Sequence, residues 1–144
     1  MKKAASYFWE TIRFAAVTLL IVIPIRAYVA QPFIVSGVSM VPSFENGEYL
    51  VIDELSYLLR APKRGEVVVF RYPLDQSKFF IKRVIGLPGE TVEIHDGKVF
   101  IKTGQTETAW NYPVIQTETM GGNGIYPLGP GQYFVLGDNR GMSL

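Results

Sequence analysis

A serine that could act as a nucleophile lies in the loop-forming stretch Gln31 to Phe44 (QPFIVSGVSMVPSF). Ser39 stands between Gly37 and Pro42, on a chain segment that must bend. A glycine close to a nucleophile lets the backbone approach a substrate, and backbone N–H groups there can face a developing oxyanion. Taken alone, a serine in such a loop is nearly always a turn residue. Ser39 therefore becomes a candidate only if the chain also supplies a base.

A candidate base lies in the strand-like stretch from residue 79 to 90 (FFIKRVIGLPGE), which carries two adjacent cations. Side-chain alternation puts Lys82 on the face of Phe80 and Val84, and Arg83 on the opposite face. Desolvation by apolar neighbours lowers the pKa of a lysine, which can then take a proton from a serine. The alternative is an edge strand whose solvated Lys-Arg pair blocks edge pairing, and the pattern alone favours that alternative. Arg83 would serve only as a cation or a packing stem, so we expect Arg83→Lys to keep substantial activity.

A third polar group ends the chain, in the stretch GDNRGMS from residue 137 to 143, directly after a predicted strand. Aspartate and asparagine commonly cap a turn after a strand. Asp138 and Arg140 are close enough in sequence to form a local ion pair. The pattern predicts a partly structural role.

The composition excludes several other kinds of site. The chain has no cysteine, which removes disulfides, thiolate catalysis and the usual structural zinc sites. Its single histidine, His95, adjoins a predicted Asp96-Gly97 hairpin turn, where a histidine is usually solvated rather than catalytic. A formal net charge of +1 and the lack of any RNA or DNA motif give no sign of a nucleic-acid partner.

The amino-terminal section predicts a membrane anchor. The apolar run Phe14 to Ala30 would rise about 26 Å as a helix, at the short end of what spans a bilayer core of about 30 Å. Arg13 and Arg26 lie near its ends, where their side chains can reach the headgroups. A cleaved signal peptide is the first alternative, but Tyr28 would occupy a position that needs a small residue. A buried core helix is the second, but nothing downstream resembles helical partners for it.

The charges around this helix predict its orientation. Lys2 and Lys3 place the short tail inside the cell, although Arg26 on the far side weakens this signal. We therefore expect residues 1–31 to form a cytoplasmic tail and a single transmembrane anchor.

The rest of the chain, residues 32–144, predicts an antiparallel, mainly β domain. Gly, Pro, Asn and Asp turn signals separate short β-branched and aromatic runs. These runs cover residues 49–52, 66–71, 79–85, 92–94, 98–102 and 132–136. Residues 53–59 could hold one helical turn, and residues 103–124 are expected to form a loop or excursion.

Together these segments resemble one family, the bacterial type I signal peptidases. The resemblance is carried by Gly-x-Ser-Met-x-Pro after an anchor (residues 37–42), RGEVVVF (64–70), KRVIGLPGE (82–90) and GDNR (137–140), in the family's order and approximate spacing. It runs from the anchor to the last residue, with only residues 103–124 poorly covered.

The resemblance implies a Ser/Lys serine protease that requires no metal or cofactor. Ser39 matches the nucleophile, and its backbone N–H would help to stabilise the oxyanion. Lys82 matches the general base, and Ser143 matches a hydroxyl that orients the lysine. Asp138 and Arg140 match a structural turn beneath the site.

The resemblance also implies the substrate and the location. Signal peptides of secreted preproteins would be cut on the extracytoplasmic side of the plasma membrane, with the apolar surface around Phe33 resting on the lipid bilayer. Small side chains at the first and third positions before the cut would enter shallow apolar pockets. The matching positions are Val35, Met40, Phe44, Leu50, Phe80 and Ile81. The oligomeric state is left open.

Two features depart from the family pattern. Some members place a serine where Gly37 stands, as an extra donor to the oxyanion. The family motif also continues with an Asp-Ser-Arg segment and a further strand region, so the resemblance implies that a carboxy-terminal part is missing after Leu144.

Two other functions compete with signal-peptide cleavage as interpretations of this sequence. A self-cleaving Ser/Lys protease of related fold is disfavoured by the anchor and by the lack of a DNA-binding module. A non-catalytic, membrane-anchored β domain that binds exported chains would need neither Ser39 nor Lys82.

Overall fold

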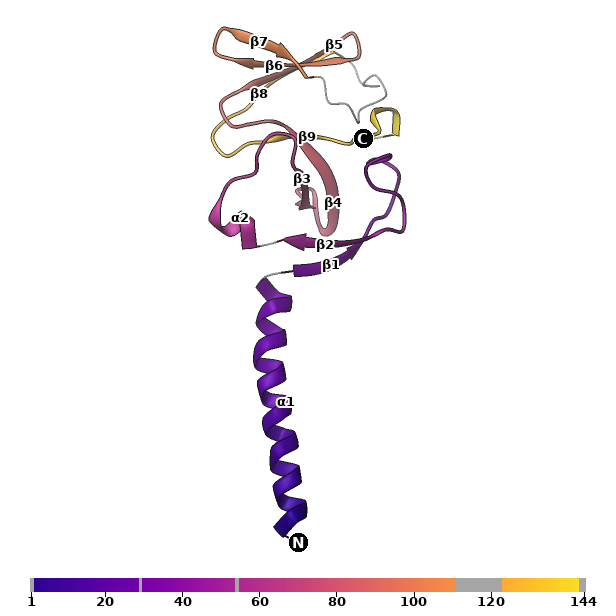
Figure 1. Cartoon of the computed structure of the whole chain (residues 1–144). Coiled ribbons are helices and arrows are strands. Elements are labelled where there is room, and N and C mark those ends of the chain that lie inside the picture. The colour runs from indigo at the N-terminus through magenta and orange to yellow at the C-terminus, as the bar shows by residue number, and fades with distance from the viewer. Residues whose placement is uncertain (1, 29, 54, 111–122, 143–144) are drawn as a thin grey trace. The chain divides into compact units, whose positions relative to one another are not determined.

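The computed structural model describes residues 2–28, 30–53, 55–110 and 123–142 (Figure 1). The chain forms two compact units. The first comprises Met1–Phe33 and Leu50–Arg60, and the second comprises Ile34–Tyr49 and Ala61–Leu144. Each unit is described by itself.

The first unit is dominated by one long helix, α1 (Lys2–Tyr28), which includes Pro24. Its stretch Ser6–Pro24 is long and apolar enough to cross a membrane, and none of that stretch is buried inside the protein. The Phe14 side chain, for example, is 74% exposed. Apolar side chains left uncovered over this length suit a lipid environment better than water. The helix begins earlier than the predicted Phe14–Ala30 because the polar residues before Phe14 are also helical.

A second, short helix follows strand β2 in the same unit. Strands β1 (Ala30–Ile34) and β2 (Tyr49–Asp53) form a two-stranded sheet, and α2 (Leu55–Leu59) comes next. Asp53 caps α2: its carboxylate accepts hydrogen bonds from the Ser56 N–H at 3.0 Å and the Ser56 hydroxyl at 2.6 Å. These bonds lower the pKa of Asp53. The helical turn predicted at residues 53–59 is confirmed.

The second unit contains two antiparallel sheets. The first sheet has the order β3-β4-β9, with β3 (Val67–Tyr72), β4 (Asp75–Gly86) and β9 (Phe134–Leu136). The second has the order β7-β6-β5-β8, with β7 (Thr106–Ala109), β6 (Lys98–Thr103), β5 (Thr91–His95) and β8 (Gly124–Pro127). The mainly β, antiparallel prediction is confirmed, and β1, β7 and β8 were not foreseen. The predicted 103–124 excursion begins with β7 and ends at β8, while residues 111–122 lie outside the described part.

The hairpin between β5 and β6 turns where the sequence predicted. Asp96 has φ 51° and Gly97 has φ 71°, the two positive values that a two-residue type I′ turn requires. His95 stacks on Phe100, with ring centroids 4.1 Å apart. This partly exposed histidine therefore has a packing role at the end of a strand.

The hydrophobic core lies between the two sheets of the second unit. It consists of Ile85, Val92, Ile94, Val99 and Ile101, with Trp110, Leu128, Phe134 and Leu136 packed against it. Gly86 marks the closest approach, because a Cβ there would lie 2.5 Å from a Val92 methyl and 2.6 Å from a Leu128 methyl. The end of β4 is thus pressed against β5, and residues 82–86 are all buried.

A buried carboxylate closes the turn between β4 and β5. The guanidinium of Arg64 donates to Glu90 and, at 2.5 Å, to the Ile85 carbonyl. Glu90 also accepts hydrogen bonds from the Leu87 N–H at 2.8 Å and the Thr103 hydroxyl at 3.1 Å. Burial by itself raises the pKa of Glu90, but these hydrogen bonds and the Arg64 charge outweigh it, so that the pKa is lowered overall.

Glu90→Gln should therefore destabilise the protein by about 1–3 kcal/mol at pH 7, because the amide cannot satisfy the same three donors. Because the folded-state pKa of Glu90 is depressed, its stabilising effect is present above the unfolded pKa and is lost as pH falls through the folded pKa. The free energy of unfolding of wild type and variant should accordingly converge below about pH 4. Chemical denaturation at several pH values measures this difference.

The matched control is Glu93→Gln, which removes the more exposed Glu93–Lys102 ion pair and should cost no more than about 1 kcal/mol. A Glu90→Gln penalty that stays the same from pH 7 to pH 3 would contradict the assignment.

Candidate active site

Lys82 and Arg83 lie on a central strand. In β4, Lys82 is opposite Val68 of β3, and Arg83 is opposite both Val67 of β3 and Leu136 of β9. Their residues are only 9% and 6% exposed. The interpretation of this stretch as an edge strand with a solvated Lys-Arg pair is therefore wrong. β4 is a central strand because β9 pairs with the side that an edge strand would leave open.

The surroundings of Lys82 disfavour its charged form. Directly paired residues share one face of a sheet, so Lys82 lies beside Val68 and, one pair further along, beside Phe70 and Phe80. The rings of Phe70 and Phe80 pack edge to face, with centroids 6.4 Å apart. Burial lowers the pKa of Lys82, because the ammonium loses hydration. The predicted direction of this pKa shift is confirmed.

Ser39 lies in a loop, residues 35–48, that is closed by its own backbone. The Val35 N–H donates to the Glu48 carbonyl at 2.9 Å, and the Gly47 N–H donates to the Val35 carbonyl at 2.8 Å. Gly37 has φ +102°, a conformation that strains any other residue, and its N–H donates to the Asn46 side chain at 2.9 Å. This backbone conformation therefore requires glycine at position 37, where some family members have serine.

The turn after β9 connects the Ser39 loop to β4. The Asn139 N–H donates to the Ser39 carbonyl at 2.9 Å, and the Asn139 side chain donates to the Val38 carbonyl at 3.2 Å. The preceding residue, Asp138, is 1% exposed and faces Arg83. Lys82 is thus the chain neighbour of one member of this buried ion pair, and Ser39 is hydrogen-bonded to the chain neighbour of the other.

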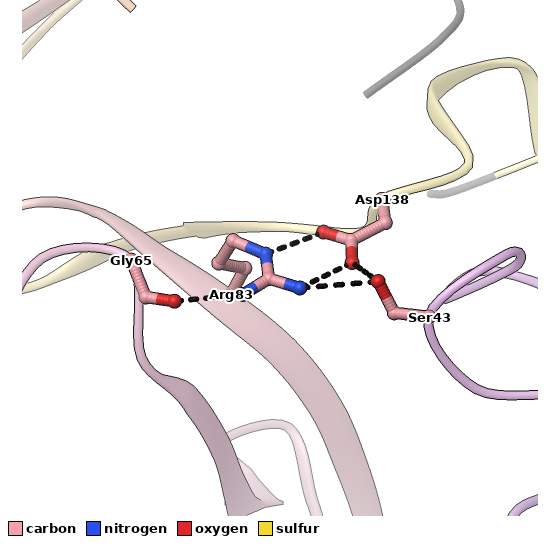
Figure 2. A network of polar contacts seen from close by, with 4 residues as sticks. All are labelled: Ser43, Gly65, Arg83 and Asp138. Atoms are coloured by element: carbon pink, nitrogen blue, oxygen red, sulfur yellow. Dashed lines mark hydrogen bonds and ion pairs between the residues drawn. The ribbon is translucent and has the colours of Figure 1, made fainter. Parts of the chain in front are cut away.

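That ion pair is bidentate, as Figure 2 shows. Arg83 Nε donates to Asp138 Oδ1 at 2.8 Å, and Nη2 donates to Oδ2 at 2.6 Å. The remaining nitrogen, Nη1, donates to the Gly65 carbonyl at 2.7 Å. Arg83 therefore uses all three of its nitrogens, and the expectation that lysine could replace it does not fit this geometry.

The carboxylate of Asp138 forms its buried ion pair with Arg83. The local ion pair between Asp138 and Arg140 stays a prediction. Arg140 begins the short 3-10 helix η1 (Arg140–Met142) and is buried. Burial lowers the pKa of Arg140 to about 10, and the nearby charge of Asp138 partly opposes this shift. Arg140 therefore stays cationic at neutral pH. Ser143, the predicted partner of Lys82, lies outside the described residues.

The predicted substrate-binding residues are only partly brought together. Val35 and Met40 are buried in the Ser39 loop, where Phe44 is half-buried. Phe80 and Ile81 are neighbours in β4, so their side chains point to opposite faces, Phe80 to the face of Lys82. Leu50 belongs to the first compact unit, not to the one that carries the other five.

Sequence reasoning missed Ser43 and underrated Asn139 and Arg83. Ser43 donates to Asp138 at 2.5 Å, a contact between residues 95 positions apart. Its only sequence signal was its place four residues after Ser39, which does not distinguish it from a turn serine.

Comparison with known proteins identifies the family of this chain. The family model of signal peptidase, peptidase S26, matches residues 8–144. The probable signal peptidase I-1 of Synechocystis sp. is 34% identical, over 93% of this chain and 70% of its own length. The signal peptidase I of Leptolyngbya laminosa is 35% identical, over 98% of this chain and 71% of its own length. The probable signal peptidase I-2 of Synechocystis sp. is 36% identical, and this chain spans 58% of it.

A solved structure gives a weaker similarity. The signal peptidase I of Enterococcus faecalis V583 is 27% identical, with a TM-score of 0.47 over 57% of this chain and 80% of that one. The resemblance noted from the motifs is confirmed by the family model and the relatives: the chain belongs to the signal peptidase I family of serine endopeptidases, which remove signal peptides.

Proposed function

We propose that this protein removes signal peptides from exported proteins through a Ser39/Lys82 dyad. The observation that best supports the dyad is the connection from Ser39 through Asn139, Asp138 and Arg83 to the strand that carries a buried Lys82. A buried lysine with a lowered pKa has the property that a general base needs, since it is neutral in a larger fraction of molecules.

The proposed reaction is acyl transfer in two steps. Ser39 Oγ attacks the scissile carbonyl carbon while neutral Lys82 Nζ takes the hydroxyl proton. The backbone N–H of Ser39 stabilises the resulting oxyanion. The C–N bond then breaks as the Lys82 ammonium protonates the leaving amine, which leaves an ester on Ser39. Water attacks this ester, Lys82 takes the water proton, and the proton returns to Ser39 Oγ as the carboxylic acid leaves.

The proposed substrate is a signal peptide with small side chains at the first and third positions before the cut. The buried or half-buried apolar side chains around Ser39 and along β4 support this class of substrate, because shallow apolar pockets exclude large or charged groups. Val35, Met40, Phe44, Leu50, Phe80 and Ile81 remain the proposed binding residues.

The dyad predicts that Ser39→Ala and Lys82→Arg both lose activity. Arginine keeps the charge but cannot deprotonate, so Lys82→Arg should lower kcat by about 10²–10⁴-fold. For wild type, kcat/KM should rise with pH through the lowered pKa of Lys82, because only the neutral amine accepts a proton. The measurement is the rate of cleavage of a peptide with alanine at the first and third positions.

Two further variants make this test independent of folding. Lys82→Met suits the apolar face and should be at least as stable as wild type, yet inactive. Lys78→Arg alters an exposed lysine of the same strand, paired with Asp75 at 3.0 Å, and should keep both rate and pH profile. An active Lys82→Arg enzyme with the wild-type pH profile would exclude the Ser/Lys mechanism. Wild-type cleavage by Ser39→Ala would exclude Ser39.

Arg83→Lys should destabilise the protein and lower its activity, in contrast to the tolerance expected from sequence. A lysine cannot form the two parallel bonds to Asp138, and breaking a buried pair costs up to about 3–5 kcal/mol. Arg71→Lys is the matched control, since Arg71 is exposed, and it should cost less than about 1 kcal/mol. The measurement is the free energy of unfolding of each variant. Equal values for Arg83→Lys and wild type would contradict a stabilising role for the two parallel Arg83–Asp138 bonds.

We also propose that α1 spans the plasma membrane once and that the domain bearing Ser39 faces the extracytoplasmic side. The uncovered apolar stretch Ser6–Pro24 and the early Lys2 and Lys3 support this orientation. The protein has no cysteine, so single introduced cysteines report topology cleanly.

In intact cells, a membrane-impermeant maleimide should label Gln76→Cys, which lies at the exposed start of β4. Ala4→Cys should be labelled only after lysis. The reverse pattern would invert the proposed orientation, and labelling of both in intact cells would exclude a single span with a cytoplasmic tail.

A further inference from the structure

The segment that carries Ser39 is attached at both ends to the same turn. At its start, the Ser39 carbonyl accepts the Asn139 N–H at 2.9 Å. Four residues later, the Ser43 hydroxyl bonds to Asp138. Between these points the Met40 side chain is 1% exposed, and directly after them the Phe44 N–H donates to the Met40 carbonyl at 3.0 Å. The short segment is therefore a turn pinned at two points, and its two anchors are adjacent residues.

The hydroxyl of Ser43 uses both its donor and an acceptor position within the buried ion pair. It donates to Asp138 Oδ2 at 2.5 Å and accepts from Arg83 Nη2 at 3.2 Å (Figure 2). Both partners are ionised groups, and hydrogen bonds to charged groups are shorter and stronger than neutral ones. Figure 2 shows the three side chains converging from the loop, from β4 and from the turn after β9.

We infer that Ser43 is a positioning residue for Ser39: its hydroxyl fixes the far end of the nucleophile's turn to the Arg83–Asp138 pair. This role rests on the proposed function of Ser39. Without the hydroxyl, Asn139 still holds the Ser39 and Val38 carbonyls, but the far end of the turn, at residue 43, loses its bond to the ion pair and can shift. A displacement of about 1 Å between reacting groups lowers a rate by as much as about 10²-fold.

The ion pair keeps its other contacts when the Ser43 hydroxyl is removed. Arg83 and Asp138 keep their two mutual hydrogen bonds, and Arg83 keeps its bond to the Gly65 carbonyl. Ser43→Ala should therefore leave the two sheets intact and loosen only the Ser39 loop. This separation of effects makes a positioning role measurable.

The experiment compares wild type, Ser43→Ala and Ser43→Thr, purified in detergent, on the same alanine-containing peptide. Ser43→Ala should lower kcat about 10–100-fold, with KM and the pH midpoint unchanged, because substrate contacts and Lys82 are untouched. Ser43→Thr retains the hydroxyl and should restore most of kcat. Ser77→Ala is the matched control: its hydroxyl also bonds an aspartate, Asp75 at 2.6 Å, but at the exposed start of β4, and this variant should cleave at the wild-type rate.

Hydrogen exchange supplies a readout that does not require activity. In Ser43→Ala, the amides of Phe44 and Asn139 should exchange at least tenfold faster, while those of β5 and β6 keep their wild-type rates. Wild-type kcat together with unchanged exchange would overturn the inference. Equal acceleration in the loop and in β5 and β6 would also overturn it, because Ser43 would then support the whole fold.

Failure of the proposed function gives a different result. If Ser39→Ala cleaves as fast as wild type, Ser39 is not the nucleophile and the catalytic part of the inference fails with it. The exchange measurement then decides alone whether Ser43 fixes the loop.

Discussion

The buried ion pair between Arg83 and Asp138 is the interaction on which the candidate site depends. Removing two charges from water costs several kcal/mol for each ion, and only good geometry with further hydrogen bonds offsets this cost. Here Arg83 makes two parallel hydrogen bonds to Asp138, and it also donates to the carbonyl of Gly65 and the hydroxyl of Ser43. Because the two residues lie 55 positions apart, one interaction fixes both β4 and the turn that contacts Ser39.

The same strand gives two adjacent cations opposite chemistry. Alternation directs Arg83 to the carboxylate of Asp138 and Lys82 to the apolar face of Val68 and Phe80. The guanidinium is stabilised as a cation, whereas burial lowers the pKa of the lysine. Arg83, whose charge is neutralised by Asp138, thus lies next to Lys82, whose charge is disfavoured by burial. The central position of β4 produces both environments.

The sequence predicted those features that depend on neighbouring residues. The Asp96-Gly97 turn, the helical turn after Asp53 and most strands follow from local pattern. Strands β7 and β8 escaped prediction because they are four residues long, largely exposed, and defined by their partners β6 and β5. The central place of β4 and the Arg83–Asp138 pair depend on contacts across the fold, so the local pattern favoured an edge strand and did not indicate that pair.

The ion pair also specifies which of the two cations faces which side. A slip of β4 by one residue would exchange the faces of Lys82 and Arg83. Lys82 would then meet the Asp138 carboxylate, which would hold it charged and useless as a base. An ammonium cannot reproduce the two parallel bonds that the guanidinium makes, so the slipped register loses part of the compensation for burying Asp138. An apolar pair at these positions could be as stable, but it would give neither register discrimination nor a charged partner for Ser43. We therefore infer that the charged pair serves to set the register of β4 and to hold Ser43, rather than to add stability.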